Sequence, residues 1–521
     1  MDDIKQLDCR VYPMSARSSF PERVSAGAQK TIAVCISGGA ARSFSASIGQ
    51  VKGLMDLFVS ERSVWGEVDA LSCLSGSAWF AALLYYANAS YSDDVLLGRV
   101  TTAAPESLTW DMLNRIDRDF IGYPLTRMTN RNMVGNALDQ VLLRHTEINR
   151  FFSRVLGKIL LAPFGADAPE KYLAWKESDV SDIVTRNASL YRSDFQTSRP
   201  DRPFLIASSS AVHIQTTRKK MYHFEYTPLY CGTAQTVEAA QLGGGYAQNI
   251  GFNSTMMSDV SENNEVAVAP AMNRFALSDL MGSSGAAPGI VFDKLGIPWI
   301  MPEFEYWPAY AKNRRAARRL SFVDGGDLED TAIVPLLMRR YPFIIAFVNS
   351  AYPLGAKNRQ CVNGINGNIS RLFGLPPKGR ILNNQETQIF ENNAGELGIL
   401  IDALTAAKGR GEIPHHVGTY RIIENNTFGV PVYEPRILWL YNDMNSNWYD
   451  RLDNSVKDLM KNRHFRYHLS DFPNFKTLFQ NCLTAFAFTP PQIQLLANMW
   501  YQSVRSAPVS NIIADYLSEN S

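Results

Sequence analysis

Ser75 is the first side chain in this 521-residue sequence whose surroundings suggest chemistry. It follows the apolar run Val68 to Leu74 and precedes a helical apolar pattern that continues to Tyr85. A serine at a sharp turn between a strand and a helix presents its hydroxyl to a substrate, and small neighbouring residues allow the tight bend. The pattern C-L-S-G-S lacks the two outer glycines of the common nucleophile elbow G-x-S-x-G. Ser75 could therefore be a nucleophile, or it could simply cap the helix that follows.

A second segment of small residues lies upstream, between a strand pattern and a helix pattern. Thr31 to Ile36 is apolar and β-branched, S-G-G-A-A-R follows at residues 37–42, and a helical pattern continues through Phe58. Backbone N–H groups at such a helix start can hold a phosphate or a developing oxyanion. A dinucleotide site would need G-x-G-x-x-G, which this segment lacks. The sequence therefore favours an oxyanion site here.

The third segment lies far downstream, where the strand-like run Leu320 to Val323 leads into Asp324, Gly325 and Gly326. Parallel α/β sheets place ligands and reactive groups at the carboxyl ends of their strands. The dipeptide Asp-Gly is also a common turn signal. Asp324 could therefore be a reactive carboxylate or part of an ordinary turn, and the three segments together are more specific than any one of them.

Together, the segments S-G-G-A-A-R, L-S-G-S-A-W and L-S-F-V-D-G-G resemble the catalytic domain of cytosolic phospholipase A2, in the wider class of patatin-like lipases. The resemblance covers the chain from Ala33 to beyond Leu496. Three further stretches resemble the same family in order: H-F-E-Y-T-P-L-Y (His223–Tyr230), F-A-L-S-D-L-M-G-S-S-G (Phe275–Gly285) and D-F-P-N-F-K-T (Asp471–Thr477).

The resemblance implies an α/β fold in which helices flank a mixed central sheet and a lid inserts over the active site. Length alone favours several domains, whereas the continuous resemblance implies one enlarged catalytic domain. We expect a polar lead-in segment at residues 1–30, a single lipase catalytic domain at residues 31–521, and the lid within residues 288–320.

The resemblance also implies a serine esterase that uses a Ser-Asp dyad. Ser75 would attack a fatty acyl ester of a phospholipid or lysophospholipid and form an acyl-enzyme, while Asp324 takes the serine proton directly. The N–H groups of Gly38, Gly39 and Ala40 would then hold the oxyanion.

Arg42 occupies the position of a family arginine that contacts the substrate phosphate, a role that suits its planar guanidinium. A structural salt bridge is the alternative. Two positions depart from the family pattern, since Ala40 and Cys73 stand where it has glycines. A glycine used at positive φ cannot be exchanged freely, so the activity could be reduced or redirected.

Three functions remain open at this point: a hydrolase, an acyltransferase that passes the same acyl group to an alcohol or amine, and a catalytically silent lipid-binding protein. A Ser-His-Asp triad also remains open, because four histidines follow Asp324, as the order of ordinary hydrolases requires. No histidine adjoins the three motifs, which favours the dyad. The four histidines are His415, His416, His464 and His468.

Composition bounds the partners and the compartment. The formal net charge of +1 gives no general attraction to nucleic acid, so none is expected as a partner. The six cysteines are scattered without paired spacing, which favours a reducing compartment. The acidic N-terminus lacks a signal-peptide pattern, and no apolar run approaches the ~20 residues that span a bilayer. We expect a cytoplasmic protein that contacts the membrane surface transiently to reach phospholipid.

No cofactor and no metal are expected. Calcium should be dispensable, because the sequence holds no D-x-D-x-D-G loop and no calcium-dependent lipid-binding module precedes Thr31.

The segment from Pro288 to Arg319 is first aromatic and then basic. Its aromatic side chains could insert into a lipid interface while its arginines meet headgroups. The alternative is a solvated helix whose aromatic side faces the core. The residues concerned are Trp299, Phe304, Tyr306, Trp307, Tyr310, Arg314, Arg315, Arg318 and Arg319.

Apolar runs predict several further elements. Phe204–Ala207 is expected as a strand, with residues 221–227 as its hairpin partner, and Pro342–Ser350 is expected as a buried strand. A helix is expected at Glu396–Lys408 and a strand near Ile437–Tyr441.

Overall fold

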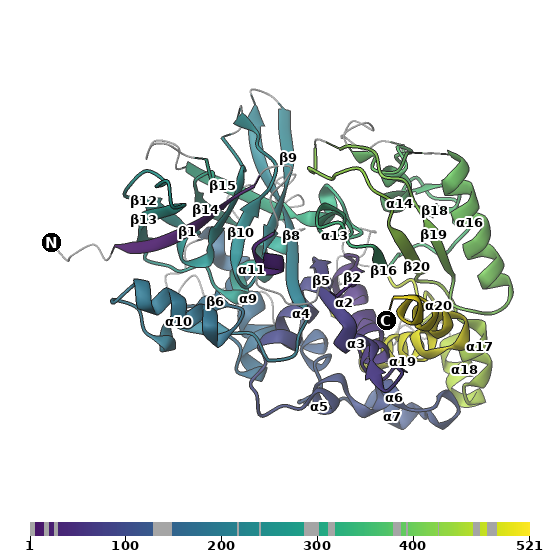
Figure 1. The fold of residues 1–521 in the computed structure, drawn as a ribbon. Helices are drawn as coiled ribbons and strands as arrows, with labels where there is room; N and C mark the ends of the chain where they lie inside the picture. The colour runs from purple at the N-terminus through teal and green to yellow at the C-terminus, as the bar shows by residue number, and fades with distance from the viewer. Residues whose placement is uncertain are drawn as a thin grey trace.

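The computed structural model describes residues 6–14, 20–24, 30–128, 148–215, 218–238, 241–285, 302–310, 318–378, 387–391, 394–425, 427–461, 469–476 and 487–520. A mixed sheet runs through the molecule, and helices pack against it (Figure 1). The protein is thus an α/β structure with a mixed central sheet, as the sequence predicted.

The centre of the sheet is parallel. β5 (Val68–Leu74), β2 (Ile32–Ile36), β16 (Phe343–Val348) and β20 (Arg436–Tyr441) lie side by side in parallel, and β19 (His415–Thr419) forms the antiparallel edge. The four parallel strands are almost wholly buried. Burial on both faces explains why their sequences are continuous apolar runs rather than alternating ones.

Helices cover both faces of this parallel part (Figure 1). α2 (Ala40–Met55), α4 (Gly76–Tyr86) and α19 (Pro490–Arg505) share one core, and α13 (Val334–Met338) and α16 (Ala394–Gly409) share another. Alternate residues of β2 belong to the two cores, so the strand separates them. α16 contains the helix that the sequence predicted in this region.

The other half of the sheet is antiparallel and contains the N-terminal segment. Outward from β8 (Phe204–Gln215), the strands are β9 (Arg218–Tyr226), β10 (Tyr230–Thr233), β11 (Gly245–Gln248), β1 (Leu7–Pro13), β13 (Glu265–Pro270) and β12 (Ser254–Met256). β9 is the predicted hairpin partner of β8. β1 pairs with β11 and β13, and Leu7, Cys9 and Val11 are buried. The segment that we expected to be a lead-in therefore supplies a strand of the sheet.

β8 pairs with two strands that run in opposite directions, β5 along its first half and a second strand, β15 (Arg318–Asp324), along its second half. Its first half pairs in parallel with β5, so that Leu74 lies beside Ser208. Its second half pairs in antiparallel with β15, so that Asp324 lies beside Ser209. β5 and β15 therefore run toward each other, and their carboxyl ends meet at adjacent residues of β8. We expected Asp324 at the end of a parallel strand, but this meeting of two strand ends is what places it next to the turn that follows β5.

β14 (Glu303–Tyr306) pairs with β15 inside the segment that we expected to form a lid. Phe304, Tyr306 and Trp307 are buried, so the core-facing alternative holds for these three aromatic residues, although a strand replaces the expected helix. Tyr310 is 37% exposed. Arg318 and Arg319 begin β15, whereas Trp299, Arg314 and Arg315 lie outside the described residues. A lid in the rest of residues 288–320 stays a prediction.

The remaining elements surround this frame. Between α4 and β8 lie α5 (Asp93–Leu97), α6 (Arg99–Thr102), α7 (Trp110–Asn114), α9 (Phe151–Leu156), β6 (Tyr172–Ala174), α10 (Glu177–Arg186) and β7 (Phe195–Thr197). Others are α1 (Pro21–Val24), α3 (Val64–Glu67), α11 (Leu277–Ser284), α14 (Gly367–Leu372), α17 (Ser446–Arg451), α18 (Asn454–Lys461) and α20 (Ala507–Glu519). Within the described ranges, no helix combines the length and the apolar composition needed to cross a bilayer.

Candidate active site

Ser75 occupies a strained turn between β5 and α4. Its backbone dihedrals are φ 54° and ψ −127°, and residues other than glycine rarely adopt a positive φ. Ser75 lies at the N-cap position of α4, yet its side chain accepts no hydrogen bond from the helix. The capping alternative therefore does not account for this serine, and its strained backbone is typical of a nucleophile elbow.

Small neighbours hold this turn in place. The Ser77 hydroxyl lies 2.8 Å from the carbonyl oxygens of Ile36 and Leu74, and it accepts a hydrogen bond from the Leu74 N–H at 3.1 Å. Because Ile36 ends β2 and Leu74 ends β5, Ser77 links the ends of the two strands. A Cβ atom on Gly76 would lie 1.9 Å from the carbonyl oxygen of Ala40. Glycine is therefore required for the two turns to touch.

Asp324 lies at the end of β15, within reach of this turn. Its carboxylate accepts a hydrogen bond from the Gly326 N–H at 2.9 Å, and the Ser75 side chain lies close enough to affect its pKa. Both Ser75 and Asp324 are only 6% exposed. Burial, followed by the charges of Asp327 and Asp330, raises the pKa of Asp324 well above its ordinary value, although the Gly326 N–H and the Ser75 side chain oppose this shift. The turn thus joins a hydroxyl to a carboxylate of raised proton affinity.

The S-G-G-A-A-R turn lies against Ser75 at the end of β2, and a Cβ atom on Gly38 would lie 3.3 Å from the Ser75 Cβ. The Gly38 N–H donates to the Asp330 carbonyl at 3.1 Å and is therefore engaged. Gly39 and Ala40 have positive φ angles of 140° and 48°, and their N–H groups meet no acceptor in the part of the chain that the structure describes. Two of the three predicted oxyanion donors can thus receive a ligand.

Arg42 is buried behind the same turn. Its guanidinium donates to the carbonyls of Asn349 at 2.9 Å and Phe475 at 2.6 Å. Burial lowers the pKa of Arg42 to about 10, while the charge of Asp330 opposes this shift. A Cβ atom on Gly39 would lie 2.7 Å from Nη2 of Arg42. These contacts favour a structural role for Arg42 over contact with a substrate phosphate. The structural alternative was a salt bridge, but the partners of the guanidinium are the main-chain carbonyls of Asn349 and Phe475.

The histidines that could complete a triad do not contact Asp324 where the structure describes them. His415 and His416 lie on β19, four strands away from β5. His415 Nδ1 lies 2.9 Å from the carbonyl oxygen of Ile413. The groups that shift the pKa of Asp324 are carboxylates, a hydroxyl and a backbone N–H. The other two candidates, His464 and His468, lie outside the described residues.

Two residues that we did not single out from the sequence also belong to the site: Ser284 and Asp330. The carbonyl and the hydroxyl of Ser284 both accept from the Ser75 N–H, at 3.2 and 3.1 Å. A signal existed for Ser284, because it lies in the stretch F-A-L-S-D-L-M-G-S-S-G. Nothing in that stretch indicates which of its serines contacts Ser75, so only the fold identifies it.

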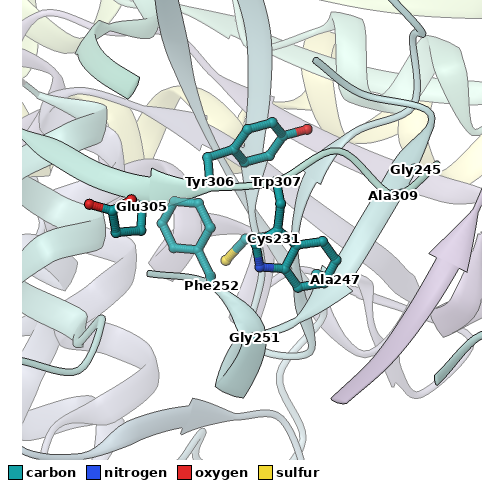
Figure 2. Close-up of a pocket in the computed structure, with 9 residues that line it drawn as sticks. All are labelled: Cys231, Gly245, Ala247, Gly251, Phe252, Glu305, Tyr306, Trp307 and Ala309. Carbon is teal, nitrogen blue, oxygen red and sulfur yellow. The ribbon is translucent and has the colours of Figure 1, made fainter. Parts of the chain in front are cut away.

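A small cavity lies elsewhere, in the antiparallel half of the sheet (Figure 2). Its volume of about 10 Å³ has room for one water molecule at most. None of its lining residues belongs to the turns around Ser75 and Asp324, so the cavity is not part of the candidate site. The lining residues are Cys231, Gly245, Ala247, Gly251, Phe252, Glu305, Tyr306, Trp307 and Ala309.

No protein-family model matches this chain, and no curated protein does. Two solved structures of human GIVD cytosolic phospholipase A2 are similar to this chain. The first is a complex with methyl gamma-linolenyl fluorophosphonate and terbium chloride, and the second is a complex with methyl gamma-linolenyl fluorophosphonate. Their TM-scores are 0.43 and 0.42 at 13% identity, and the matches cover 95% and 96% of this chain but 61% and 60% of those chains.

Another structure of human GIVD cytosolic phospholipase A2 is more similar. Its TM-score is 0.52 at 12% sequence identity, and the match covers 96% of this chain and 64% of that chain. Our chain therefore spans less than two thirds of the length of that enzyme. Almost all of this sequence takes part in the match, and the chain has the fold of human GIVD cytosolic phospholipase A2.

Proposed function

We propose that this protein is a lipid acyl hydrolase that cleaves fatty acyl esters of phospholipids or lysophospholipids through Ser75 and Asp324. One observation carries the proposal: a serine on a strained turn lies beside a buried carboxylate whose pKa is raised. The fold shared with a phospholipase A2 supports the choice of lipid esters as the substrate class. The protein would meet these lipids by transient contact with a membrane surface.

In the proposed mechanism, Ser75 attacks the carbonyl carbon of the ester while Asp324 takes the proton from the serine hydroxyl. The tetrahedral intermediate places its oxyanion near the N–H groups of Gly39 and Ala40, which stabilise the negative charge. When the intermediate collapses, the ester C–O bond breaks and the leaving alcohol takes the proton from Asp324. Water then attacks the acyl-enzyme, gives a proton to Asp324, and releases the fatty acid as the proton returns to Ser75.

The environment of Asp324 supports its role as the base. A carboxylate with the ordinary pKa of ~3.9 has too little proton affinity to take a proton efficiently from a serine at neutral pH. Burial and the neighbouring charges of Asp327 and Asp330 raise that affinity. A direct transfer from Ser75 to Asp324 then needs no imidazole between them.

Gly38 and Arg42 have supporting roles in this proposal. The Gly38 N–H is bonded to the Asp330 carbonyl, and the Arg42 side chain is bonded to two main-chain carbonyls. These bonds hold the turn on which Gly39 and Ala40 present their N–H groups. Preorganised donors stabilise an oxyanion better than donors that must reorient during the reaction.

The test is the release of fatty acid from phospholipid and lysophospholipid by the wild type and by Ser75→Ala. Loss of such a nucleophile costs several powers of ten in rate, so the variant should fall to the background rate. Ser518→Ala is the matched control, because Ser518 is exposed and its hydroxyl donates to the Ala514 carbonyl within α20, far from Ser75 in the sequence. Ser77→Ala is unsuitable as a control, because its hydroxyl links β2 and β5.

Each result has a definite meaning. A Ser75→Ala variant that keeps more than a few per cent of the wild-type rate would show that Ser75 is not the nucleophile. A wild type that transfers acyl groups to an added alcohol faster than it releases fatty acid would favour the acyltransferase. A folded wild type that binds lipid without turnover would favour the silent lipid-binding protein.

A further inference from the structure

Ser284, the last residue of α11, contacts the turn at Ser75 through two acceptors. The Ser75 N–H lies 3.2 Å from the Ser284 carbonyl oxygen and 3.1 Å from its hydroxyl oxygen. The same hydroxyl donates to the Ser208 carbonyl at 2.7 Å. Since a hydroxyl carries one proton, Ser284 can only accept on the side that faces Ser75. Its orientation is therefore set by β8.

The end of α11 is also bonded to the elements that carry the two reactive residues. The Ser209 hydroxyl lies 2.9 Å from the carbonyl oxygen of Val323, which precedes Asp324 on β15, and 3.1 Å from that of Ser283. The Trp79 Nε1 of α4 donates to the Met281 carbonyl at 3.0 Å. α11 is thus fixed to β8, β15 and α4 at the point where β5 and β15 meet.

We propose that Ser284 is a positioning residue that holds Ser75 in line with Asp324, an inference that rests on the proposed function. The positive φ of Ser75 is unfavourable for a serine and persists only if the surroundings enforce it. The Ser75 N–H belongs to the peptide unit whose orientation sets this φ, and Ser284 supplies both acceptors for it. Removal of the hydroxyl takes away one acceptor and the link to β8, so the turn relaxes and the Ser75 hydroxyl moves away from Asp324.

The test combines the rate at which a fluorophosphonate labels Ser75 with kcat and KM for a soluble short-chain ester. In Ser284→Ala, labelling and kcat should fall by about tenfold or more, because small errors in the placement of a reacting group are costly. KM should stay within about twofold of the wild type, because the groups that bind the ester are unchanged. Because an unfolded fraction would also lower kcat without changing KM, kcat is calculated per mole of protein that takes the label at the end point, and the labelling rate constant is compared as a second readout.

Ser283→Ala is the matched control. Ser283 is adjacent to Ser284 and equally buried, and its hydroxyl donates to the Asp279 carbonyl within α11 at 2.7 Å. The control removes the same atom from the same helix without touching Ser75, so its labelling rate should stay within about twofold of the wild type. Ser284→Cys is a second variant of similar volume, and it should behave like Ser284→Ala because a thiol is a weak hydrogen-bonding group.

Wild-type labelling rates in folded Ser284→Ala and Ser284→Cys would overturn the inference. Equal losses in Ser284→Ala and Ser283→Ala would overturn it as well, since they would reflect the removal of any buried hydroxyl. If both Ser284 variants fail to fold while Ser283→Ala folds, Ser284 serves folding and not positioning. A wild type that takes no label at Ser75 contradicts the proposed function itself, and the inference falls with it.

Discussion

At the scale of the single residue, Asp324 is a carboxylate in a buried position, and burial disfavours its charged form. In the proposed mechanism the carboxylate must be ionised to accept a proton from Ser75, yet burial and the charges of Asp327 and Asp330 favour its protonated form. An enzyme that needs a strong base accepts this conflict at a cost in stability. The cost can be measured, because asparagine keeps the shape of the side chain and removes its charge.

Asp324→Asn should abolish hydrolysis and raise the free energy of unfolding at neutral pH. The pKa of Asp324 is higher in the folded state than in the unfolded state, so ionisation opposes folding once the pH exceeds the unfolded value of ~3.9. The stability gained by the variant should be smallest below that pH, grow as the pH rises, and level off above the folded pKa. Its plateau should be about 1.4 kcal/mol for each unit by which the pKa is raised.

Denaturant unfolding of wild type and Asp324→Asn over a series of pH values measures this difference. A gain that shrinks as the pH rises would contradict a raised pKa. The pH dependence of the wild-type rate should report the ionisation of Asp324 as well, because the proposed hydrolysis requires the ionised carboxylate. The rate should fall as the pH decreases through the folded pKa, above the range of an ordinary aspartate.

Local motifs indicate the residue types of the site, and distant partners decide what each residue does. The segments around Ser75 and Asp324 could be recognised because each is short and continuous. The engaged N–H of Gly38 and the buried bonds of Arg42 could not be predicted, because their partners Asp330, Asn349 and Phe475 are far away in the sequence. The substitution of alanine for the third glycine does not remove the positive φ at that position.

At the scale of elements, the site depends on two turns that touch. The start of α4 contacts the S-G-G-A-A-R turn at Gly76, where a Cβ atom would lie 1.9 Å from the Ala40 carbonyl oxygen. An oxygen of the main chain cannot move aside as a flexible side chain can. The spacing between Ser75 and the N–H groups of Gly39 and Ala40 is therefore set by the absence of a side chain at Gly76.

Gly76→Ala should push the two turns apart and lower hydrolysis by about a hundredfold or more. Overpacking at a buried contact should also reduce stability by ~1–3 kcal/mol. Gly66→Ala is the matched control, because no heavy atom of the described residues beyond its own stretch of chain lies within 4 Å of a Cβ atom built on Gly66. The rates of both variants on the same lipid and their thermal midpoints provide the comparison, and a Gly76→Ala variant as active as Gly66→Ala would refute this view of the site.

Apolar runs predict the strands of the parallel centre well, because these strands are buried on both faces. The antiparallel half is harder, and β1 was missed although Leu7, Cys9 and Val11 alternate with polar residues. The direction of β15 could not be predicted, because it depends on pairing with β8. Sequence patterns show that a segment is a strand, whereas its neighbour and direction follow from the rest of the fold.

At the scale of the whole molecule, a buried ion cluster ties the N-terminal segment to the sheet. Arg339 follows α13 and donates to Glu22 of α1 at 2.7 Å and to Glu225 of β9 at 2.8 Å. The three side chains are at most 3% exposed. These ion pairs connect α1, β9 and the end of α13, which lie far apart in the sequence. The polar composition of the first thirty residues did not predict this connection.

Arg339→Met should destabilise the fold by ~3–5 kcal/mol, because it leaves two buried carboxylates without their cation. The same substitution at Arg451 is the control, since Arg451 pairs with Glu106 at the surface and both side chains are more than half exposed. Exposed pairs contribute little to stability, so Arg451→Met should unfold at nearly the same urea concentration as the wild type. Equal midpoints for the two variants would show that the buried cluster does not hold the molecule together.

The central claim is that Ser75 is the nucleophile and Asp324 its base, and covalent labelling tests it most directly. The protein is treated with a fluorophosphonate, the adduct is counted by intact mass, and the labelled peptide is mapped. The account predicts one adduct per chain, on Ser75, in the wild type and in Ser518→Ala, no adduct in Ser75→Ala, and much slower labelling in Asp324→Asn. An adduct on another residue that forms equally fast in Ser75→Ala would contradict it.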